Sequence, residues 1–172
     1  ATPGAPRNLR LRHSRPCDGT KLASGNWSVS NKLTPASPAC TVVLADDDLT
    51  SRWLLRGVLR RLGFLLLAEA TNGEEAVAAV TRTKPDIVLL DVCMPHRTGP
   101  DALPAIIAAH SGAKIVMLTS MADERTVTDC ITKGAADYLR KDTPIDEICR
   151  VLVELRERIG AQRAAQETYA GT

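Results

Sequence analysis

Residues 41–48 read Thr-Val-Val-Leu-Ala-Asp-Asp-Asp, an apolar run that stops abruptly at three adjacent carboxylates. A short apolar run bounded by polar residues is typical of a buried strand. The stretch that follows repeats apolar residues at helical spacing and closes at Gly63, a residue that favours helix termination. The apolar positions of that stretch are Trp53, Leu54, Val58, Leu59 and Leu62. This part of the chain therefore predicts a strand, a carboxylate-rich turn and a helix, in that order.

The same alternation continues through the rest of the regular region. Further strands are predicted at 64–68, 86–90, 114–118 and 137–140, and further helices at 71–84, 101–110, 123–133 and 144–159. The helix at 101–110 contains Pro104, which we place in the first turn because a proline is tolerated there. Five strands alternating with five helices predict an α/β fold with a parallel sheet covered by helices on both faces. The strands are nearly continuous in apolar residues, as burial on both faces requires.

The composition changes near residue 40 and again after Ile159. Residues 1–40 hold six basic side chains against one acid and are rich in Pro, Ser and Gly, so we predict a disordered basic arm. A solvated tail, an artefact of the start site, an organellar transit segment and a nucleic-acid-binding arm are all open interpretations of it. The regular region at 41–160 is predicted to be one domain, and 161–172 a polar tail. We expect no second domain.

Composition and charge exclude several classes of function. The net charge of +2 is too small to indicate nucleic-acid binding, and an aromatic content of 3% argues against a base-stacking surface. No run of 18 apolar residues is present, so no membrane span is predicted. The five cysteines and three histidines are scattered without the spacing of a zinc site. A soluble protein that binds neither membrane nor nucleic acid directly is therefore expected.

Chemically informative residues follow four of the predicted strands. In an open parallel sheet, ligands bind beyond the carboxyl ends of the strands, so these residues should meet at one edge. They are Asp46, Asp47 and Asp48 after the first strand, Asp91 after the third, Thr119 after the fourth and Lys141 after the fifth. Asp48 is better interpreted as the N-cap of the following helix than as a ligand. The edge thus combines carboxylates, a hydroxyl and one ammonium group.

This combination suits phosphoryl transfer. Carboxylates that share a crevice repel one another, and a hard divalent cation such as Mg²⁺ relieves that repulsion. Lys141 would supply a positive charge to a phosphoryl oxygen, and Thr119 a hydrogen-bond donor. Catalysis of phosphoryl transfer is mainly positioning and charge neutralisation. An ionised carboxylate can itself be the nucleophile, so no histidine base is required.

In this order and at these separations, the motifs resemble the receiver domain of two-component response regulators. The motifs are Asp46-Asp47-Asp48, Asp91-Val-Cys-Met-Pro95 with Gly99, Leu118-Thr-Ser120 and Tyr138-Leu-Arg-Lys141, and the resemblance covers about residues 41–160. It implies a flavodoxin-like, doubly wound (βα)5 fold whose five parallel strands are ordered 2-1-3-4-5. It also implies that Asp91 is the phosphoacceptor, with Lys141 and Thr119 as its catalytic partners.

The resemblance further implies a metal site and a switch. Asp46, Asp47, Asp91 and the backbone carbonyl of Cys93 would hold Mg²⁺. Thr119 would move toward the phosphoryl group while the aromatic side chain of Tyr138 turns inward. Lys141 would pair with Asp91 before transfer and with the phosphoryl group after it. Phosphorylation adds a dianionic group, and this group shifts the balance between the two arrangements only by its difference in affinity for them.

The partners expected from the resemblance are proteins. A sensor histidine kinase or phosphotransfer protein would supply the phosphoryl group, and a downstream target would bind the surface formed by residues 123–160. Phosphorylation would change that surface, and homodimerisation on phosphorylation is a further expectation. Beyond taking up and hydrolysing its own phosphoryl group, the chain is not expected to be an enzyme. A bacterial cytoplasm is the expected location.

Departures from the family pattern leave alternatives open. Asp142, rather than the proline of many receivers, follows Lys141, and Pro144 comes later. That arrangement is similar to receivers that carry a C-terminal helix-turn-helix, so the chain is a stand-alone receiver or a fragment of a DNA-binding regulator. A pseudo-receiver that binds partners without phosphorylation is a second alternative.

Two enzyme classes are disfavoured by single positions. A haloacid-dehalogenase-like phosphatase also uses a strand-end aspartate and Mg²⁺, but it needs a second aspartate two residues later, where this chain has Cys93. A dinucleotide-binding enzyme needs a glycine-rich turn after the first strand. Three aspartates occupy that turn here, and their charges would repel a pyrophosphate.

Overall fold

The computed structural model describes residues 39–120 and 124–170. The strands are β1 (Thr41–Ala45), β2 (Leu65–Ala70), β3 (Ile87–Asp91), β4 (Lys114–Thr119) and β5 (Asp137–Arg140), and the helices are α1 (Leu49–Arg61), α2 (Gly73–Thr83), α3 (Gly99–Ala109), α4 (Glu124–Thr132) and α5 (Ile145–Ala170). Nearly all of the predicted basic arm, together with position 123 and the end of the predicted tail, lies outside the described residues. Each predicted strand and helix is present, with its bounds shifted by a few residues at most, apart from the end of α5.

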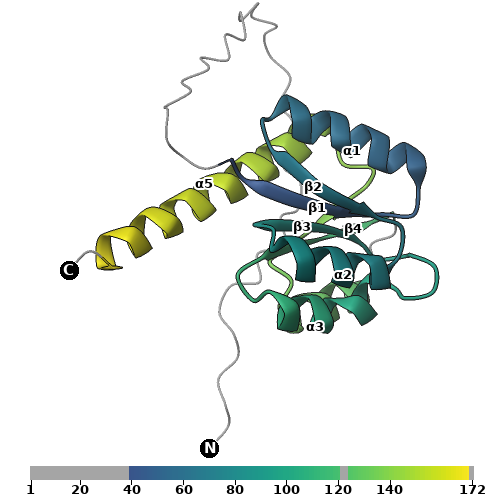
Figure 1. Cartoon of the computed structure of the whole chain (residues 1–172). Helices are drawn as coiled ribbons and strands as arrows, with labels where there is room; N and C mark the ends of the chain where they lie inside the picture. The colour runs from purple at the N-terminus through teal and green to yellow at the C-terminus, as the bar shows by residue number, and fades with distance from the viewer. Residues whose placement is uncertain (1–38, 121–123, 171–172) are drawn as a thin grey trace, which may run out of the picture. The chain divides into compact units, whose positions relative to one another are not determined.

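The five strands form one sheet in the order β2-β1-β3-β4-β5, with every neighbouring pair parallel (Figure 1). This confirms the flavodoxin-like α/β fold and the strand order expected from the family resemblance. From β1 the chain first adds β2 on one side and then β3 on the other. The strand order therefore reverses between β1 and β3, which is where such sheets bind ligands. Asp46 and Asp91 lie at the carboxyl ends of these two strands.

Both faces of the central strands β1, β3 and β4 are buried, and alternate residues along these strands enter different cores. In β1, Val42 and Leu44 pack into the core covered by α1 and α5. Val43 and Ala45 pack into the core covered by α2, α3 and α4. Figure 1 shows this division, with α1 and α5 on one side of the sheet and α2 and α3 on the other. The core thus fixes the strands whose ends carry the polar residues.

Helix α3 begins two residues earlier than the sequence predicts. Thr98 is its N-cap and accepts a hydrogen bond from the Asp101 backbone N–H, so the helix starts at Gly99. Pro104 therefore lies inside the helix rather than in its first turn. A proline inside a helix leaves the carbonyl four residues earlier without its usual donor. Pro104 is exposed, so water has access to this part of the helix.

Helix α5 continues to Ala170, well beyond the end predicted near Ile159. The residues after Gly160 are mostly alanine, glutamine and arginine, which favour helix even where no apolar face is present. Arg163 forms an ion pair with Asp86, which also accepts hydrogen bonds from the Thr41 backbone and hydroxyl. The predicted polar tail is thus helical up to Ala170. Although α5 is long, none of the helices in the described ranges is apolar enough over a sufficient length to cross a membrane.

Candidate functional site

Three aspartates meet at the carboxyl edge of the sheet. Asp46 follows β1 and is fully buried, Asp91 ends β3 and is 2% exposed, and Asp47 is exposed. A carboxylate oxygen of each lies within 4.8 Å of one from the other two. The pairing of Ala45 with Leu90 in neighbouring strands accounts for this proximity, because the next residue on each strand continues the register. The sequence prediction that these carboxylates gather is confirmed.

Lys141, which follows β5, joins the same cluster. Its Nζ atom lies 2.8 Å from Oδ2 of Asp46 and 3.0 Å from Oδ2 of Asp91. The backbone N–H of Lys141 donates to the carbonyl oxygen of Thr119 at 2.8 Å, so the lysine is anchored where β4 and β5 end. One ammonium group therefore contacts both buried carboxylates.

The charges of this cluster are not balanced. Burial raises the pKa of Asp91 above its ordinary value, and the charge of Asp46 raises it further, while Lys141 opposes both effects. Burial lowers the pKa of Lys141, but its hydrogen bonds and charge interactions with Asp46 and Asp91 outweigh burial and raise the pKa overall. Lys141 is therefore protonated at neutral pH, and it is one cation in a cluster that holds three carboxyl groups.

The donor set suits a hard divalent cation. Carboxylate oxygens are the ligands that Mg²⁺ prefers, and one or two carboxylates together with water and phosphate oxygens are its usual protein site. Asp46, Asp47 and Asp91 supply such oxygens at one place, and their excess negative charge favours a cation. Asp47 is the exposed member, which leaves a side of the cluster open to solvent.

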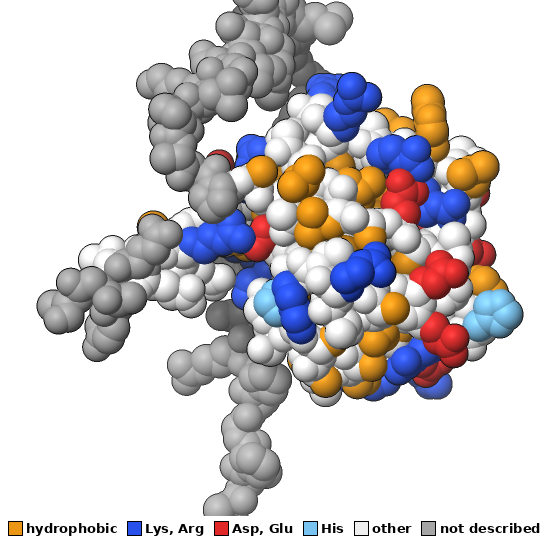
Figure 2. Space-filling model, in the orientation of Figure 1, with side chains coloured by type: hydrophobic (Ala, Val, Ile, Leu, Met, Phe, Trp, Pro, Cys, Tyr) orange, Lys and Arg blue, Asp and Glu red, His pale blue; other side chains and the backbone are white. Residues whose placement is uncertain are grey.

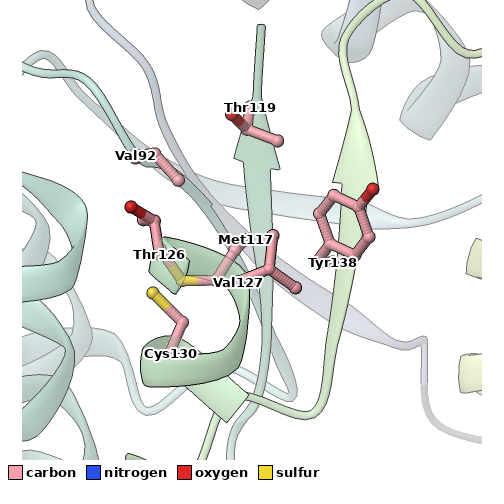
Figure 3. A pocket seen from close by; sticks show the side chains of 7 residues that line it. All are labelled: Val92, Met117, Thr119, Thr126, Val127, Cys130 and Tyr138. Carbon is pink, nitrogen blue, oxygen red and sulfur yellow. The ribbon is translucent and has the colours of Figure 1, made fainter. Parts of the chain in front are cut away.

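Thr119 and Tyr138 lie on one face of the sheet beside this edge. Thr119 ends β4 and is buried, and Tyr138 is half-buried opposite Met117 of β4. Both line a small pocket closed by α4, which Figure 3 shows. The residues that line it are Val92, Met117, Thr119, Thr126, Val127, Cys130 and Tyr138. The two predicted switch residues thus lie close to each other, although the movement itself stays a prediction.

The remaining two predicted positions have different outcomes. Asp48 is the N-cap of α1, as the sequence predicts, and it accepts hydrogen bonds from the backbone N–H groups of Thr50 and Ser51. These bonds lower the pKa of Asp48 below its ordinary value. Cys93 has an exposed side chain in the loop after β3. The proposed role of its backbone carbonyl as a metal ligand stays a prediction.

Sequence reasoning missed two residues of α1 that contact the acid pair. The Ser51 hydroxyl donates to Oδ2 of Asp46 at 2.6 Å. Arg52 donates through Nη1 to the backbone carbonyl oxygens of Asp46 and Asp47. Both are polar residues in the first turn of the helix that follows the acids, and this position was the available signal. Their partners depend on the path of the loop, which the spacing of apolar residues does not describe.

Gly99 is a further residue of the site whose role comes from a close backbone approach. A Cβ atom added at Gly99 would lie 2.1 Å from the carbonyl oxygen of Asp91 and 3.2 Å from the Met117 methyl carbon. The backbone N–H of Gly99 also donates to the carbonyl oxygen of Val92 at 3.2 Å. Only glycine allows α3 to begin this close to the end of β3.

We expect Gly99→Ala to lower the free energy of unfolding by about 1–3 kcal/mol, because the backbone around Asp91 must shift. Gly57→Ala is the matched control, since a Cβ there meets no atom within 4 Å. In the exposed interior of α1, that alanine should instead stabilise the protein by about 0.5–1 kcal/mol. Urea denaturation of both variants measures the difference. Equal stabilities would show that the approach of Gly99 to Asp91 does not constrain the loop.

Comparison with known proteins gives consistent matches over this part of the chain. Residues 42–153 match the family model of the response regulator receiver domain. The chemotaxis protein CheY of Listeria monocytogenes is 36% identical over 111 residues, which cover 64% of this chain and 93% of the relative. The transcriptional regulatory protein YxjL of Bacillus subtilis is 38% identical over 108 residues, which are 62% of this chain and 50% of that protein.

A solved structure agrees with these sequence relatives. The CheX–CheY complex of Borrelia burgdorferi, crystallised with BeF3 and Mg²⁺, matches with a TM-score of 0.65 and 27% identity. The match covers 67% of this chain and 88% of the relative's chain. The fold described above is therefore shared with known proteins.

Proposed function

The chain belongs to the response regulator receiver domain family, and from this membership we propose that it is a phosphorylation-dependent signalling switch with Asp91 as its phosphoacceptor. One observation supports this assignment most strongly. Asp91 is a buried carboxylate that contacts Lys141 while lying within 4.8 Å of the acid pair Asp46 and Asp47. That arrangement supports the proposal, because it would bring a nucleophile, a phosphate-binding cation and a metal site together.

The proposed reaction needs only the residues of this cluster and a phosphodonor. An ionised oxygen of Asp91 attacks the phosphorus atom of a phosphohistidine, an O–P bond forms, and the P–N bond breaks. The electron pair of that bond stays on the imidazole of the donor. Bound Mg²⁺, held by Asp46, Asp47, Asp91 and the carbonyl of Cys93, would neutralise charge on the phosphoryl oxygens. Lys141 and Thr119 would contact those oxygens after transfer.

We propose that the readout surface is formed by α4, β5 and α5. The pocket between Thr119 and α4 supports this, because movement of Thr119 toward a phosphoryl group would empty space beside Tyr138. Tyr138 belongs to β5 and lines the same pocket, which supports the proposal that its ring follows that movement. The surface would then differ between the two forms of the protein. In this proposal the chain catalyses nothing beyond uptake and hydrolysis of its own phosphoryl group.

The proposed partners are a sensor histidine kinase or phosphotransfer protein, which donates the phosphoryl group, and a downstream target protein, which binds the readout surface. The Borrelia relative was crystallised in complex with another protein, CheX, which supports a protein partner. Homodimerisation on phosphorylation and a cytoplasmic location complete the proposal. A DNA-binding output domain is the second candidate arrangement, because YxjL, a transcriptional regulator, is matched over only half of its length.

Incubation with acetyl phosphate and Mg²⁺ tests this proposal. We expect intact-mass spectrometry to show one added phosphoryl group on the full chain, and a chelator to prevent the addition. Transfer from acetyl phosphate forms the O–P bond on Asp91 and releases acetate. A chain that gains no phosphoryl group and does not speed hydrolysis of acetyl phosphate would favour the pseudo-receiver, a binding module that works without phosphorylation.

A further inference from the structure

Arg52, in the first turn of α1, reaches back to the loop that carries the acid pair. Its Nη1 atom donates hydrogen bonds to the backbone carbonyl oxygen of Asp46 at 2.7 Å and to that of Asp47 at 3.1 Å. The Arg52 side chain is only 13% exposed. One guanidinium group therefore holds two consecutive peptide groups, and these belong to the residues whose carboxylates cluster with Asp91.

The helix itself does not hold these peptide groups. The first backbone hydrogen bond of α1 runs from the Arg52 N–H to the carbonyl oxygen of Asp48, one residue beyond the acid pair. Carbonyl groups near a buried site need donors, and here Arg52 supplies them. A rotation of either peptide would change the direction of the attached carboxylate. The hydrogen bonds from Arg52 oppose that rotation.

The charge of Arg52 is offset by Glu69 at the end of β2. The Arg52 Nε atom lies 3.4 Å from Oε2 of Glu69, and Nη2 of Arg56 lies 2.8 Å from Oε1 of the same carboxylate. Helix α1 carries four arginines and no acid, and Figure 2 shows basic side chains over this part of the surface. A guanidinium group without a nearby acid would repel a cation bound at this site and weaken its binding. With Glu69 present, Arg52 can act through its hydrogen bonds.

We propose that Arg52 is a positioning residue for Mg²⁺ binding, which fixes the direction of the Asp46 and Asp47 carboxylates by holding their backbone carbonyl groups. The inference rests on the proposed function, which assigns Mg²⁺ to these carboxylates. It adds a residue that contacts neither the metal nor the phosphoryl group. Residues that orient metal ligands from outside the ligand set typically change metal affinity by about 10–100-fold when they are replaced.

Isothermal titration of the full chain with MgCl₂ tests the proposal without requiring phosphorylation. We expect Arg52→Ala to weaken Mg²⁺ binding by about 10-fold. Arg52→Lys keeps the charge and one donor group, so it should recover part of the affinity. Arg56→Ala is the matched control, because Arg56 pairs with the same Glu69 but has no hydrogen bond to the loop carbonyls. Its affinity should stay within about twofold of the wild type.

Asp47→Asn and the wild type separate a failure of the proposed function from a failure of the role of Arg52. Asp47→Asn should abolish most binding, and a wild-type chain that binds no Mg²⁺ would contradict the proposed function itself. If the wild type binds Mg²⁺ and a folded Arg52→Ala variant binds it with the same affinity, only the role of Arg52 is overturned. Equal losses in Arg52→Ala and Arg56→Ala would also overturn it, because the contact with Glu69 that both arginines share, rather than the carbonyl contacts, would then be responsible. If Arg52→Ala does not fold, Arg52→Met decides, because methionine keeps an unbranched side chain but has no donor group, and wild-type affinity in that variant overturns the proposal.

Discussion

Asp91→Asn is expected to reduce phosphoryl uptake from acetyl phosphate below detection while leaving the protein folded. The amide has the shape of the carboxylate but cannot form the acyl phosphate, so the nucleophile is lost. Lys141 keeps its contact with Asp46, so the variant retains an ion pair at the strand ends. Intact-mass spectrometry in the presence of Mg²⁺ measures the remaining uptake, and circular dichroism checks the fold.

Asp142→Asn is the matched control for this loss. Asp142 is an exposed aspartate next to Lys141 in the sequence, and it pairs with Arg140 rather than with the buried cluster. Its replacement should leave phosphoryl uptake at the wild-type level. Uptake that survives in Asp91→Asn but disappears in Asp142→Asn would identify Asp142 as the acceptor. That result would contradict the assignment of Asp91.

Lys141→Ala is expected to lower the free energy of unfolding at neutral pH by about 2–3 kcal/mol in the absence of Mg²⁺. Removal of one partner from a fully buried ion pair costs about 3–5 kcal/mol, and Lys141 is 18% exposed, so a smaller loss is expected. The buried carboxylates of Asp46 and Asp91 would then repel each other without a counter-ion. Added Mg²⁺ should restore part of the stability, because a bound cation replaces the missing charge.

The pH dependence of this loss follows from Asp91. Its pKa already lies above the ordinary value, so its ionised form lowers stability at neutral pH, and that cost disappears as pH falls and the carboxyl group takes up a proton. Without Lys141 the pKa of Asp91 should rise further. The difference in stability between the variant and the wild type should therefore shrink as pH is lowered toward the ordinary aspartate range.

Urea denaturation with and without Mg²⁺ at several pH values measures both effects. Lys133→Ala provides the control, because Lys133, which directly follows α4, forms an exposed ion pair with Asp129 of that helix. An exposed pair of this kind contributes about 0.3–0.5 kcal/mol. A Lys141→Ala variant as stable as Lys133→Ala, with no response to Mg²⁺, would show that Lys141 does not balance the buried carboxylates.

The parts of the fold that follow from local pattern were predictable. The apolar run at 41–45 and the helical spacing after it place β1 and α1, and the same alternation places the other strands and helices. Adjacent carboxyl ends then bring Asp46 and Asp91 together, because strands of a parallel sheet end at one edge. The strand order required the family resemblance, since periodicity within a strand does not identify its neighbours.

The parts that depend on the path of the loops, or on helix without an apolar face, were not predictable from the spacing of apolar residues. The contact of Arg52 with the loop carbonyls depends on the path of the chain between β1 and α1. The close approach of Gly99 to Asp91 depends on where α3 begins, which is two residues earlier than predicted. The extension of α5 lacks an apolar face, so its helical state follows from residue propensity and from the Arg163–Asp86 pair.

The most direct test of the proposed switch is to locate the phosphoryl group on the chain. Treatment of the acetyl-phosphate-reacted protein with borohydride reduces an aspartyl phosphate to the alcohol and converts that residue to homoserine. We predict that peptide mass spectrometry finds homoserine at position 91, and that neither a sample without Mg²⁺ nor the Asp91→Asn variant contains it. Homoserine at any other aspartate, or none in a sample that gained a phosphoryl group, would contradict the assignment of Asp91 as the phosphoacceptor.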